Sequence, residues 1–377
     1  MKFAHLADLH LGKTVNGFPM IEDQKYILNQ ILQILDERHV DAVCIAGDVY
    51  DRSVPSVEAV NLLNTFLSEL NKRKLEVYII AGNHDSSERL SYGSGLFHQI
   101  HIHIEGSWSG HLACHDFKDK YGIVRVHLLS YIHPSDINRY SEEKAGSYNK
   151  AIETAIQTAD LSKDRNIILT HQFVSGTVLD TDGSEELNIG GLDAVDGHLY
   201  DSFDYVAMGH IHRPQKLLRE TMRYAGTPLP YSFAECRYQK SMPVITMHEK
   251  GTEPLIELCP LEPLHGMREI HGYFNDILHN SKDDAHTEDY MHIILNDEND
   301  VTDALPQLRD IYPNLMKLDY DNTRTRNQND LRILKKMEKQ NPMDIFSTFY
   351  RDSNGQEMSD EQKKIVQDLI TSVWEES

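Results

Sequence analysis

Basic residues are scarce in this sequence relative to acidic ones. Its 377 residues contain 37 Lys and Arg against 59 Asp and Glu, which gives a formal net charge of −22. This balance argues against a chain that coats nucleic acid or an anionic membrane through a general basic field. It leaves open a phosphate-binding site built on metal ions, because a bound divalent cation can be the largest local charge in a site.

Cysteine is also rare, and its positions are scattered. The four cysteines contain no C-x-x-C pair, so they predict neither a disulfide framework nor a zinc knuckle. We expect them to be reduced and buried in a cytoplasmic protein. They are Cys44, Cys114, Cys236 and Cys259.

Long apolar runs are missing as well. None approaches the roughly 18 residues that a membrane span needs, so we expect a soluble protein that does not associate with membranes. Asp8 lies too early for a signal peptide, and no hydrophobic segment surrounds it. Internal repeats and low-complexity tracts are also absent, and the length suggests two to three domains.

Short apolar runs alternate with helical periodicity in the first half of the chain. Apolar residues at helical spacing predict helices over residues 21–39 and 56–73, the second with Ser56 as its start. Strands alternating with helices of this length predict an α/β sheet covered on both faces. The predicted strands are residues 2–7, 42–46, 77–81, 123–129, 166–170 and 205–208.

The later part of the chain changes in character. Residues 244–248 and 255–258 predict a hairpin that closes the sheet, and Pro260 and Pro263 then mark a domain boundary. We predict a first domain over residues 1–262, a small α+β domain over 263–325 and a charged helical segment over 326–377. Within the last two we expect strands at 291–295 and 315–318, and helices at 301–311, 329–339 and 359–375.

Polar residues follow five of the predicted strands. In α/β sheets, ligands bind outside the carboxyl ends of the strands, so these side chains are expected to converge on one point. Oxygen and imidazole ligands without thiolates suit manganese, iron or zinc. The segments are Asp8-Leu9-His10, Gly47-Asp48-Val49-Tyr50-Asp51, Gly82-Asn83-His84-Asp85, Thr170-His171-Gln172 and Gly209-His210-Ile211-His212.

Each of these segments alone has an ordinary structural explanation. Asp8-x-His10 is common as a strand-end turn, and GNHD is compatible with an Asn/Gly turn. His171 alone fits a core histidine, and GHIH fits a surface loop. Their joint occurrence in this order, each after an apolar strand, favours a metal site.

The motif set resembles that of the calcineurin-like metallophosphoesterases, over residues 1–260. Within that superfamily the chain is similar to the nuclease subunits of bacterial nuclease–ATPase complexes. The resemblance implies a β-sandwich flanked by helices, a small α+β capping domain and a C-terminal helical tail. The stretches that carry this second likeness are HLADLHLG, GDVYDRSVPS, DALPQLRDIYP from Asp303 and PMDIFSTFYR from Pro342.

The resemblance implies two divalent metal ions, with Mn²⁺ expected first and Mg²⁺, Fe²⁺ or Zn²⁺ as alternatives. One ion would be held by Asp8, His10, Asp48 and His212, and the other by Asp48, Asn83, His171 and His210. The Asp48 carboxylate would bridge them. Two ions at such a site activate water for phosphodiester hydrolysis and neutralise the phosphate oxygens.

The resemblance also gives His84 and Asp51 a role in the reaction. His84 lies beside a ligand and would stabilise the transition state or protonate the leaving oxygen. Asp51 would orient His84, as a carboxylate does in the phosphatase branch of the superfamily. A salt bridge from Asp51 to Arg52 or to another neighbour is the alternative. Related nucleases commonly have a histidine at the Asp51 position, so a second histidine is not expected to take part in the reaction here.

Charge is unevenly distributed near the last motif. Residues 166–212 contain no Lys or Arg, whereas basic residues follow directly afterwards. We predict that Arg213, Lys216 and Arg237 contact DNA phosphates, with a solvated loop and strand face as the alternative. The basic residues are Arg213, Lys216, Arg219, Arg223, Arg237 and Lys240.

Three aromatic residues near the C-terminus share one helical face. Phe346, Phe349 and Tyr350 are spaced as anchors for docking in a groove, and local helix packing is the alternative. In the resembled family this region binds the coiled coil of the ATPase partner. The resemblance also implies a homodimer, for which the helix over residues 56–73 is a candidate interface.

Three functions compete at this point. The first is a Mn²⁺-dependent DNA nuclease of repair and recombination, acting as a single-strand endonuclease and a 3′→5′ exonuclease on duplex ends, including hairpins. The second is a phosphodiesterase for small nucleotides, which has no evident need for the later domain and helical tail. The third is a non-catalytic subunit that binds DNA ends, which would predict the loss of a metal ligand. Every metal-ligand position of the resembled family carries a metal-binding residue type in this sequence, so we favour the DNA nuclease.

Overall fold

The computed structural model describes residues 1–179, 194–326, 347, 350, 358–359 and 362–366. The chain divides into two compact units. The first comprises Met1–Glu269 with Glu288–Met291, and the second comprises Ile270–Thr287 with the chain from His292 onward. Our boundaries at residues 262 and 325 remain predictions.

A six-stranded sheet contains the first predicted strands of the chain. Its strands β1, β4, β5 and β6 run parallel, and β13 and β14 extend it as an antiparallel hairpin. This confirms the predicted hairpin. The order is β14 (Leu255–Pro260), β13 (Ser241–Thr246), β1 (Lys2–Leu6), β4 (Ala42–Ala46), β5 (Glu76–Ile80) and β6 (Ile102–Glu105).

A second six-stranded sheet belongs to the same unit. Strands β8, β9, β10 and β12 are parallel neighbours, and each outer strand pairs antiparallel. The order is β11 (Gln215–Leu217), β12 (Arg219–Tyr224), β10 (Tyr205–Gly209), β9 (Arg165–His171), β8 (Gly122–Leu129) and β7 (Ala113–Asp119). A two-stranded ribbon pairs β2 (Thr14–Val15) with β3 (Phe18–Pro19).

One apolar core lies between the two sheets. It joins Cys44 and Tyr78 of the first sheet to Val126, Leu169 and Ala207 of the second. The intervening residues face outward but are buried too, because helices cover both outer faces. This explains why the strands appear in the sequence as continuous apolar runs rather than as alternating ones.

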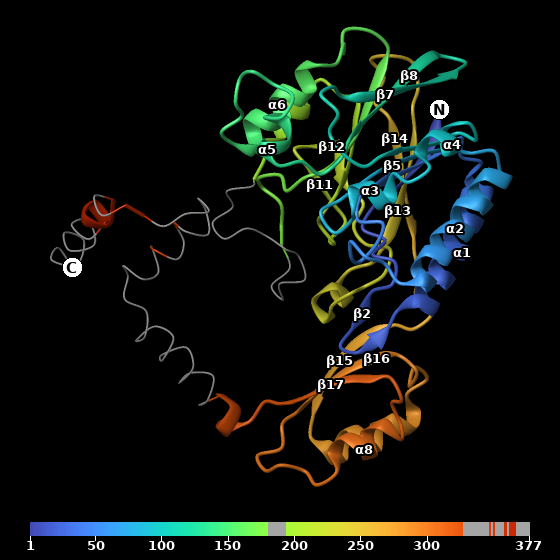
Figure 1. The fold of residues 1–377 in the computed structure, drawn as a ribbon. Coiled ribbons are helices and arrows are strands. Elements are labelled where there is room, and N and C mark those ends of the chain that lie inside the picture. Colours follow the sequence, from blue (N-terminus) through green and yellow to red (C-terminus); the bar gives the residue numbers. More distant parts are fainter. Residues whose placement is uncertain (180–193, 327–346, 348–349, 351–357, 360–361, 367–377) are drawn as a thin grey trace. The chain divides into compact units, whose positions relative to one another are not determined.

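Helices cover the sandwich on its two outer sides. On the first sheet, α1 (Ile21–Arg38) and α2 (Val57–Lys72) lie side by side (Figure 1). Helix α2 begins after Ser56, whose hydroxyl accepts a hydrogen bond from the Ala59 N–H, as its predicted start requires. On the second sheet, α5 (Pro134–Ile137) and α6 (Tyr148–Gln157) pack Ile137 and Ile152 against the core. Short helical segments complete the unit: α3 (Ser87–Leu90), α4 (Ser94–His98), η1 (Gly197–Tyr200) and η2 (Phe233–Arg237).

The structure confirms the calcineurin-like α/β sandwich that we expected. Each of the six strands predicted between residues 2 and 208 is present within one or two residues of its predicted bounds. The peripheral strands β6, β7, β11 and β12 were not predicted. On β7 every second residue is exposed, but apolar and polar residues do not alternate clearly in its sequence, so the strand was missed.

The later part of the chain forms an α+β arrangement. A three-stranded sheet orders β15 (Met267–Gly272), β16 (Tyr290–Leu295) and β17 (Leu315–Tyr320). Helices α7 (Phe274–Asn280) and α8 (Ala304–Arg309) and the 3₁₀ helix η3 (Ser281–Asp283) accompany it. Helix α8 is shorter than the predicted helix over residues 301–311. The helix predicted at 329–339 lies outside the described residues, and of the one predicted at 359–375 residues 362–366 are helical.

The prediction for the cysteines is correct in part. All four are free, but only Cys44 and Cys259 are buried. The prediction is wrong for Cys114, which is exposed on the outer strand β7, and for Cys236, which is half-buried. Within the part of the chain that the structure describes, no helix has the length and apolar character needed to cross a membrane.

The core between the sheets should dominate the stability of the first unit. Leu169→Ala removes a side chain with 0% exposure from that core and is expected to lower the free energy of unfolding by about 2–5 kcal/mol. Leu255→Ala is the matched control, because Leu255 lies on β14 with 64% exposure, and its effect should stay within about 0.5 kcal/mol. Urea unfolding followed by circular dichroism measures both. Equal losses for the two variants would contradict the sandwich core.

Candidate metal centre

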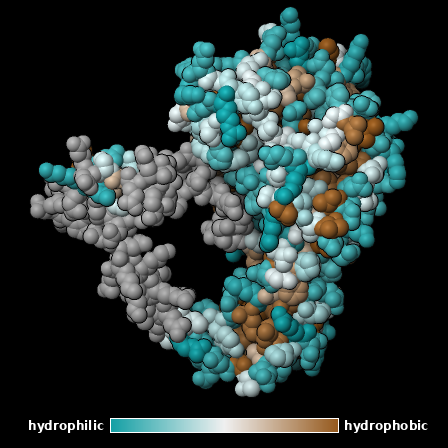
Figure 2. All heavy atoms as spheres, in the orientation of Figure 1, coloured by the Kyte–Doolittle hydropathy of each residue, from teal (hydrophilic) through white to brown (hydrophobic). Residues whose placement is uncertain are grey.

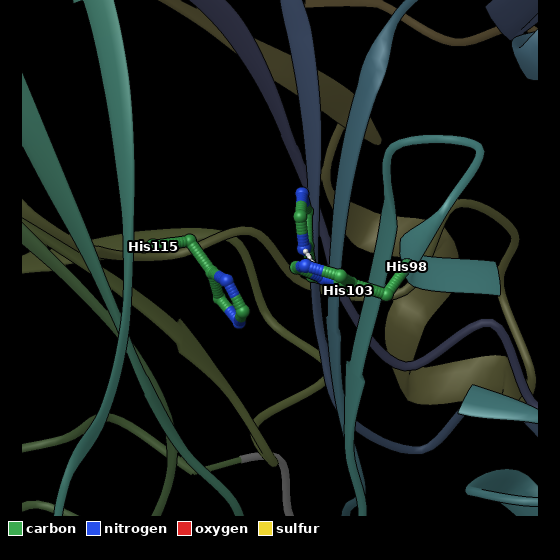
Figure 3. Close-up of side chains that lie close together, drawn as sticks. All are labelled: His98, His103 and His115. Carbon is green, nitrogen blue, oxygen red and sulfur yellow. Dashed lines mark hydrogen bonds between the residues drawn. The ribbon is translucent and has the colours of Figure 1, made fainter. Parts of the chain in front are cut away.

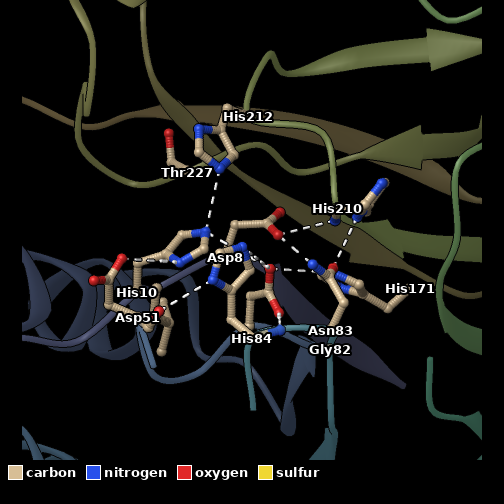
Figure 4. Close-up of polar contacts among 12 residues, drawn as sticks. Asp8, His10, Asp51, Gly82, Asn83, His84, His171, His210, His212 and Thr227 are labelled. Atoms are coloured by element: carbon tan, nitrogen blue, oxygen red, sulfur yellow. Dashed lines mark hydrogen bonds and ion pairs between the residues drawn. The ribbon is translucent and has the colours of Figure 1, made fainter. Parts of the chain in front are cut away.

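Residues at or just after the carboxyl ends of five strands meet at one edge of the sandwich (Figure 4). The strands are β1, β4 and β5 of the first sheet and β9 and β10 of the second. The structure brings together all seven predicted ligand residues, and six of them are buried. They are Asp8, His10, Asp48, His171, His210 and His212, together with the half-buried Asn83.

The two sheets are connected directly at this edge. Asp8, after β1, accepts a hydrogen bond through Oδ1 from the backbone N–H of His210, after β10, at 2.9 Å. Asp48 accepts the N–H of His84 through Oδ1 at 2.9 Å, which joins the ends of β4 and β5. The carboxylates therefore fix the strand ends as well as offering free oxygens to a ligand.

Several site residues have left-handed backbone conformations. Asp8, His10 and Asp48 have φ values of 52°, 44° and 48°, which non-glycine residues rarely adopt outside functional sites. These turns aim the side chains back across the strand ends. The strain is tolerated because the buried sheets on either side hold the backbone in place.

Two glycines of the motifs are needed for close approach. A Cβ on Gly82 would lie 2.0 Å from Asp48 Oδ1, and a Cβ on Gly47 would lie 2.3 Å from His171 Nδ1. Gly47 also has a φ of 88°, which disfavours any side chain. The glycines in the GD and GN motifs therefore make room for the neighbouring ligands.

The Asp48 carboxylate lies between two groups of side chains. On one side, Asp48 Oδ2 is 3.7 Å from His10 Nε2, which in turn lies 3.2 Å from His212 Nε2. On the other side, Asp48 Oδ2 is 3.3 Å from His171 Nε2. One carboxylate oxygen thus faces both groups.

Asn83 completes the second group. Its Oδ1 lies 3.1 Å from His171 Nε2 and 3.0 Å from His210 Nδ1. The other nitrogen of His171, Nδ1, is 2.8 Å from the backbone oxygen of Ala46. A carbonyl only accepts, so Nδ1 carries a proton and Nε2 is the nitrogen that could bind a metal.

The electrostatics of the site are unbalanced in the protein alone. Burial, opposed by His171 and reinforced by Asp48, raises the pKa of Asp8 to about 7. Burial alone would lower the pKa of His171, but Asp48 and Asp8 outweigh it and raise the pKa to about 9. Burial lowers the pKa of His210 to about 3. In the protein alone, bound protons therefore neutralise the negative charge of the carboxylates, which a cation would otherwise neutralise.

The donor set fits divalent cations. Asp8 Oδ2 and His10 Nδ1 are buried and have no hydrogen-bond partner among the described residues. The Nε2 atoms of His10 and His212 face each other at 3.2 Å, so without an ion one of them must carry a proton for the other to accept, and a bound cation would take the place of that proton. Buried carboxylate, amide and imidazole donors without a thiolate match Mn²⁺, Fe²⁺ or Zn²⁺.

A buried carboxylate holds the His212 ring from behind. Glu235 Oε1 accepts from His212 Nδ1 at 3.0 Å, and its Oε2 accepts from Lys240 Nζ at 2.6 Å and from Thr227 Oγ1 at 2.9 Å. Burial alone would raise the pKa of Glu235, but Lys240 and His212 hold it below its usual range. This fixes the proton on Nδ1 and directs Nε2 of His212 into the site.

Sequence reasoning did not find Glu235 or assign a structural role to Lys240. The two residues lie five positions apart in a segment without a recognisable motif. Their partner His212 lies more than twenty positions earlier, so only the fold reveals the pairing.

His84 lies at the mouth of the site, next to Asp48. Its side chain is 23% exposed, and its Nε2 is 4.0 Å from Asp48 Oδ2. Its Nδ1 lies 3.0 Å from the backbone oxygen of Asp51. The Asp51 carboxylate itself contacts Lys13 Nζ at 2.7 Å and lies 3.7 Å from His10 Nδ1. It also lies 3.6 Å from Arg52 Nε.

The last residue of the GNHD motif stabilises the loop rather than facing the ligands. Asp85 accepts backbone N–H groups of Gly82, Tyr50 and Val49 at 2.9–3.1 Å. Burial and the nearby Asp48 raise its pKa to about 6. Asp85 therefore ties the loop after β5 to the segment after β4.

The predicted DNA-contacting residues differ in their surroundings. Arg237 is exposed, Arg213 lies over the Tyr238 ring at 5.4 Å from its centre, and Lys216 is bound by Glu220. The prediction of a wider basic surface is wrong for Lys240 and Arg223. Lys240 is 3% exposed and pairs with Glu235, and Arg223 is 9% exposed and pairs with Glu220. Arg219 binds Asp201 at 3.1 Å.

The predicted partner-binding stripe lies largely outside the described residues. Phe346 and Phe349 are among those not described, as is most of the segment over residues 326–377. Tyr350 is helical, and its hydroxyl accepts a hydrogen bond from Gln362 Nε2 at 2.9 Å.

Known proteins resemble this chain over both of its parts. A family model described as calcineurin-like phosphoesterase matches residues 1–214. A second model, described as the type 5 capsule protein repressor C-terminal domain, matches residues 263–354. A Staphylococcus epidermidis protein, named as the SbcD subunit of the nuclease SbcCD, is 31% identical over 382 residues, covering 99% of each chain.

Two solved structures were also matched. The crystal structure of TT1561 of Thermus thermophilus is 10% identical, covers 69% of this chain and 99% of its own, and gives a TM-score of 0.42. A dimetal phosphatase from Danio rerio is 14% identical, covers 70% of this chain and 99% of its own, and gives 0.41.

The chain belongs to the calcineurin-like phosphoesterase family. Within it, the chain belongs to the family of SbcD nuclease subunits. Members of the superfamily use divalent metals, which agrees with the donor set at the strand ends.

The contact behind His212 predicts a specific effect on metal binding. Glu235→Gln removes the charge that fixes the His212 tautomer and should weaken Mn²⁺ binding by about 10–100-fold. Calorimetric titration of the full chain with Mn²⁺ measures the change. Glu220→Gln, which removes an exposed carboxylate paired with Lys216 and Arg223, should bind Mn²⁺ normally. Unchanged binding by folded Glu235→Gln would show that the buried carboxylate does not support the metal ligand.

Proposed function

We propose that this chain is a metal-dependent DNA nuclease that uses two divalent ions, with Mn²⁺ as the first choice. The observation that supports this most is the position of the Asp48 carboxylate, which faces one imidazole group through His10 and another through His171. Asp8 and His212 would complete one ion site, and Asn83 and His210 the other. When bound, the two ions would supply an activated water and neutralise the charge on the phosphate.

The residues of the chain would do two things around these ions. Asp48 would belong to both ion sites, because its Oδ1 is fixed by the His84 N–H while its Oδ2 lies 3.3 Å from His171 Nε2 and 3.7 Å from His10 Nε2. Asp8 would link the two sheets through its Oδ1, which accepts the backbone N–H of His210. Its Oδ2 has no hydrogen-bond partner among the described residues and would bind the ion. Each carboxylate therefore has one structural oxygen and one available oxygen.

His84 would act on the substrate rather than on a metal. Its Nδ1 donates to the Asp51 carbonyl, so only Nε2 can gain or lose a proton during the reaction. That nitrogen lies on the Asp48 side of a partly exposed ring. We propose that it stabilises the phosphate in the transition state or protonates the leaving oxygen. In this scheme Asp51 orients His84 through its backbone oxygen.

The carboxylate of Asp51 would have a separate role. It lies between Lys13 and the His10 ring, at 2.7 Å and 3.7 Å. At that position the carboxylate would compensate the charge of Lys13 and act on the His10 ring through its charge alone, because 3.7 Å is too long for a hydrogen bond. Asp51 would thus act on His84 through its backbone oxygen and on His10 through its carboxylate charge.

DNA is the substrate class that we favour. The relative named as a nuclease matches along 99% of this chain, including the part that follows the phosphoesterase region. We propose single-strand endonuclease and 3′→5′ exonuclease activity on duplex ends and hairpins, in DNA repair and recombination. Arg213, Lys216 and Arg237 remain the proposed phosphate contacts.

An SbcC-type ATPase is the proposed partner, because the relative is named as one subunit of SbcCD. We propose that Phe346, Phe349 and Tyr350 dock on it, that its ATP binding controls access to the site, and that the complex is cytoplasmic.

A homodimer is proposed through α2. Two grooves of about 370 and 350 Å³ flank this helix. Val57 and Val60 on α2 are exposed, as is Leu96 on α4. Figure 2 shows hydrophobic residues gathered on the side of the molecule where α2 and α4 lie. Such a surface is typical of an interface.

Substitution of His84 separates catalysis from metal binding. His84→Ala should retain Mn²⁺ binding and lose about 10²–10⁴-fold in the rate of phosphodiester cleavage, the range for a general acid–base group. His198→Ala, at an exposed histidine paired with Asp201, is the matched control and should cleave normally. If His84→Ala lost its metal instead, His84 would have to be reassigned as a ligand.

Substrate preference decides between the remaining functions. With Mn²⁺ and the partner ATPase, the chain should cleave hairpin, duplex and single-stranded DNA, and omission of metal should abolish cleavage. The products are resolved by gel electrophoresis. Hydrolysis of small phosphodiesters alone would favour the nucleotide phosphodiesterase, and DNA-end binding without cleavage would favour the architectural subunit.

A further inference from the structure

A histidine-rich segment lies apart from the metal centre described above. Five of the 21 histidines fall within residues 98–115, and none of them belongs to the strand-end motifs. Three of the five come together in the folded chain (Figure 3). They are His98 at the end of α4, His103 on β6 and His115 on β7.

The three rings are close enough to share one ion. One ring nitrogen from each lies within 4.8 Å of the other two. His98 Nδ1 and His103 Nδ1 face each other at 2.9 Å. The rings of His103 and His115 are 4.1 Å apart between their centres.

The orientation of His103 is fixed before any ion binds. Its Nε2 lies 3.1 Å from Glu76 Oε2, and a carboxylate accepts, so Nε2 carries the proton. The lone pair is therefore on Nδ1, which points at His98. The His103 ring also stacks on Tyr78 at 5.0 Å with an angle of 13°. A carboxylate behind a histidine is the usual support of a metal ligand.

The third histidine has an unused nitrogen. His115 Nε2 is buried and has no hydrogen-bond partner among the described residues. Because no other group engages this nitrogen in the described part of the chain, it is available to an ion held by the other two rings.

The chemistry of the donors selects the occupant. Three imidazoles without a carboxylate among the ligands favour Zn²⁺ over Mn²⁺ or Mg²⁺, which prefer oxygen. The exposed His98 side leaves a fourth position for water. We propose that His98, His103 and His115 form a Zn²⁺ site distinct from the metal centre at the strand ends.

The position in the fold suggests a structural role for this ion. Strand β6 is the outermost strand of the first sheet, and β7 is the outermost strand of the second. An ion held by both would connect the two sheets at their open edge. It would also anchor α4, which has no buried residue of its own.

Zinc titration of the full chain tests the site. In competition with a chromogenic chelator, wild type should bind one more equivalent of Zn²⁺ than His98→Gln or His115→Gln. His98 is exposed, so its substitution removes a ligand without opening the core. Glu76→Gln should retain the equivalent but bind it about 10–100-fold more weakly.

The matched control is His111→Gln, an exposed histidine of the same segment that is not part of the triad. It should bind as many equivalents as wild type. Zn²⁺ should also raise the thermal unfolding temperature of wild type and His111→Gln more than that of His98→Gln. Equal stoichiometry and affinity in wild type, His98→Gln and His115→Gln would overturn the proposal, as would loss of the equivalent in His111→Gln.

Discussion

The buried Asp48 carboxylate is the group on which the rest of the centre depends. Its Oδ1 is fixed by the N–H of His84, and a side chain on Gly82 would collide with it. Its Oδ2 pairs with His171 Nε2 at 3.3 Å and faces His10 Nε2 at 3.7 Å. Burying a carboxylate without a counter-charge is strongly unfavourable, so the fold must supply cations or protons at this point. The raised pKa of His171 shows how the protein alone meets this requirement.

This requirement explains the polarity of the sandwich. The two sheets share an apolar core along most of their length. At the carboxyl ends of β1, β4, β5, β9 and β10, buried carboxylate and imidazole side chains replace apolar ones. The contact from Asp8 to the His210 N–H joins the sheets there. Because packing elsewhere fixes the strands, the left-handed turns at Asp8, His10 and Asp48 can persist.

Both sheets' central strands and the seven candidate metal ligands could be predicted from the sequence, because each motif directly follows an apolar run along the chain. The apolar runs before Asp8, Asp48 and Asn83 predict parallel strands, and parallel strands place their carboxyl ends together. Contacts between distant segments could not be predicted in this way. Glu235 supports His212 only through the fold. Lys240 was predicted to lie on a basic surface, yet it is buried against the same Glu235. A linear pattern of charges does not show which of them neutralise one another inside the protein.

The same reasoning changes the meaning of the net charge of −22. Charges that are paired or bound to cations contribute little to the field felt by a distant DNA molecule. Asp8 and Asp48 are buried at the candidate metal centre, and Glu235 is neutralised by Lys240 and His212. Several basic side chains are likewise engaged, since Lys216 and Arg223 share Glu220. The formal charge therefore does not describe the site. What a phosphate would meet at the strand ends is a set of cation ligands together with His84, and the attraction there depends on whether the cations are bound.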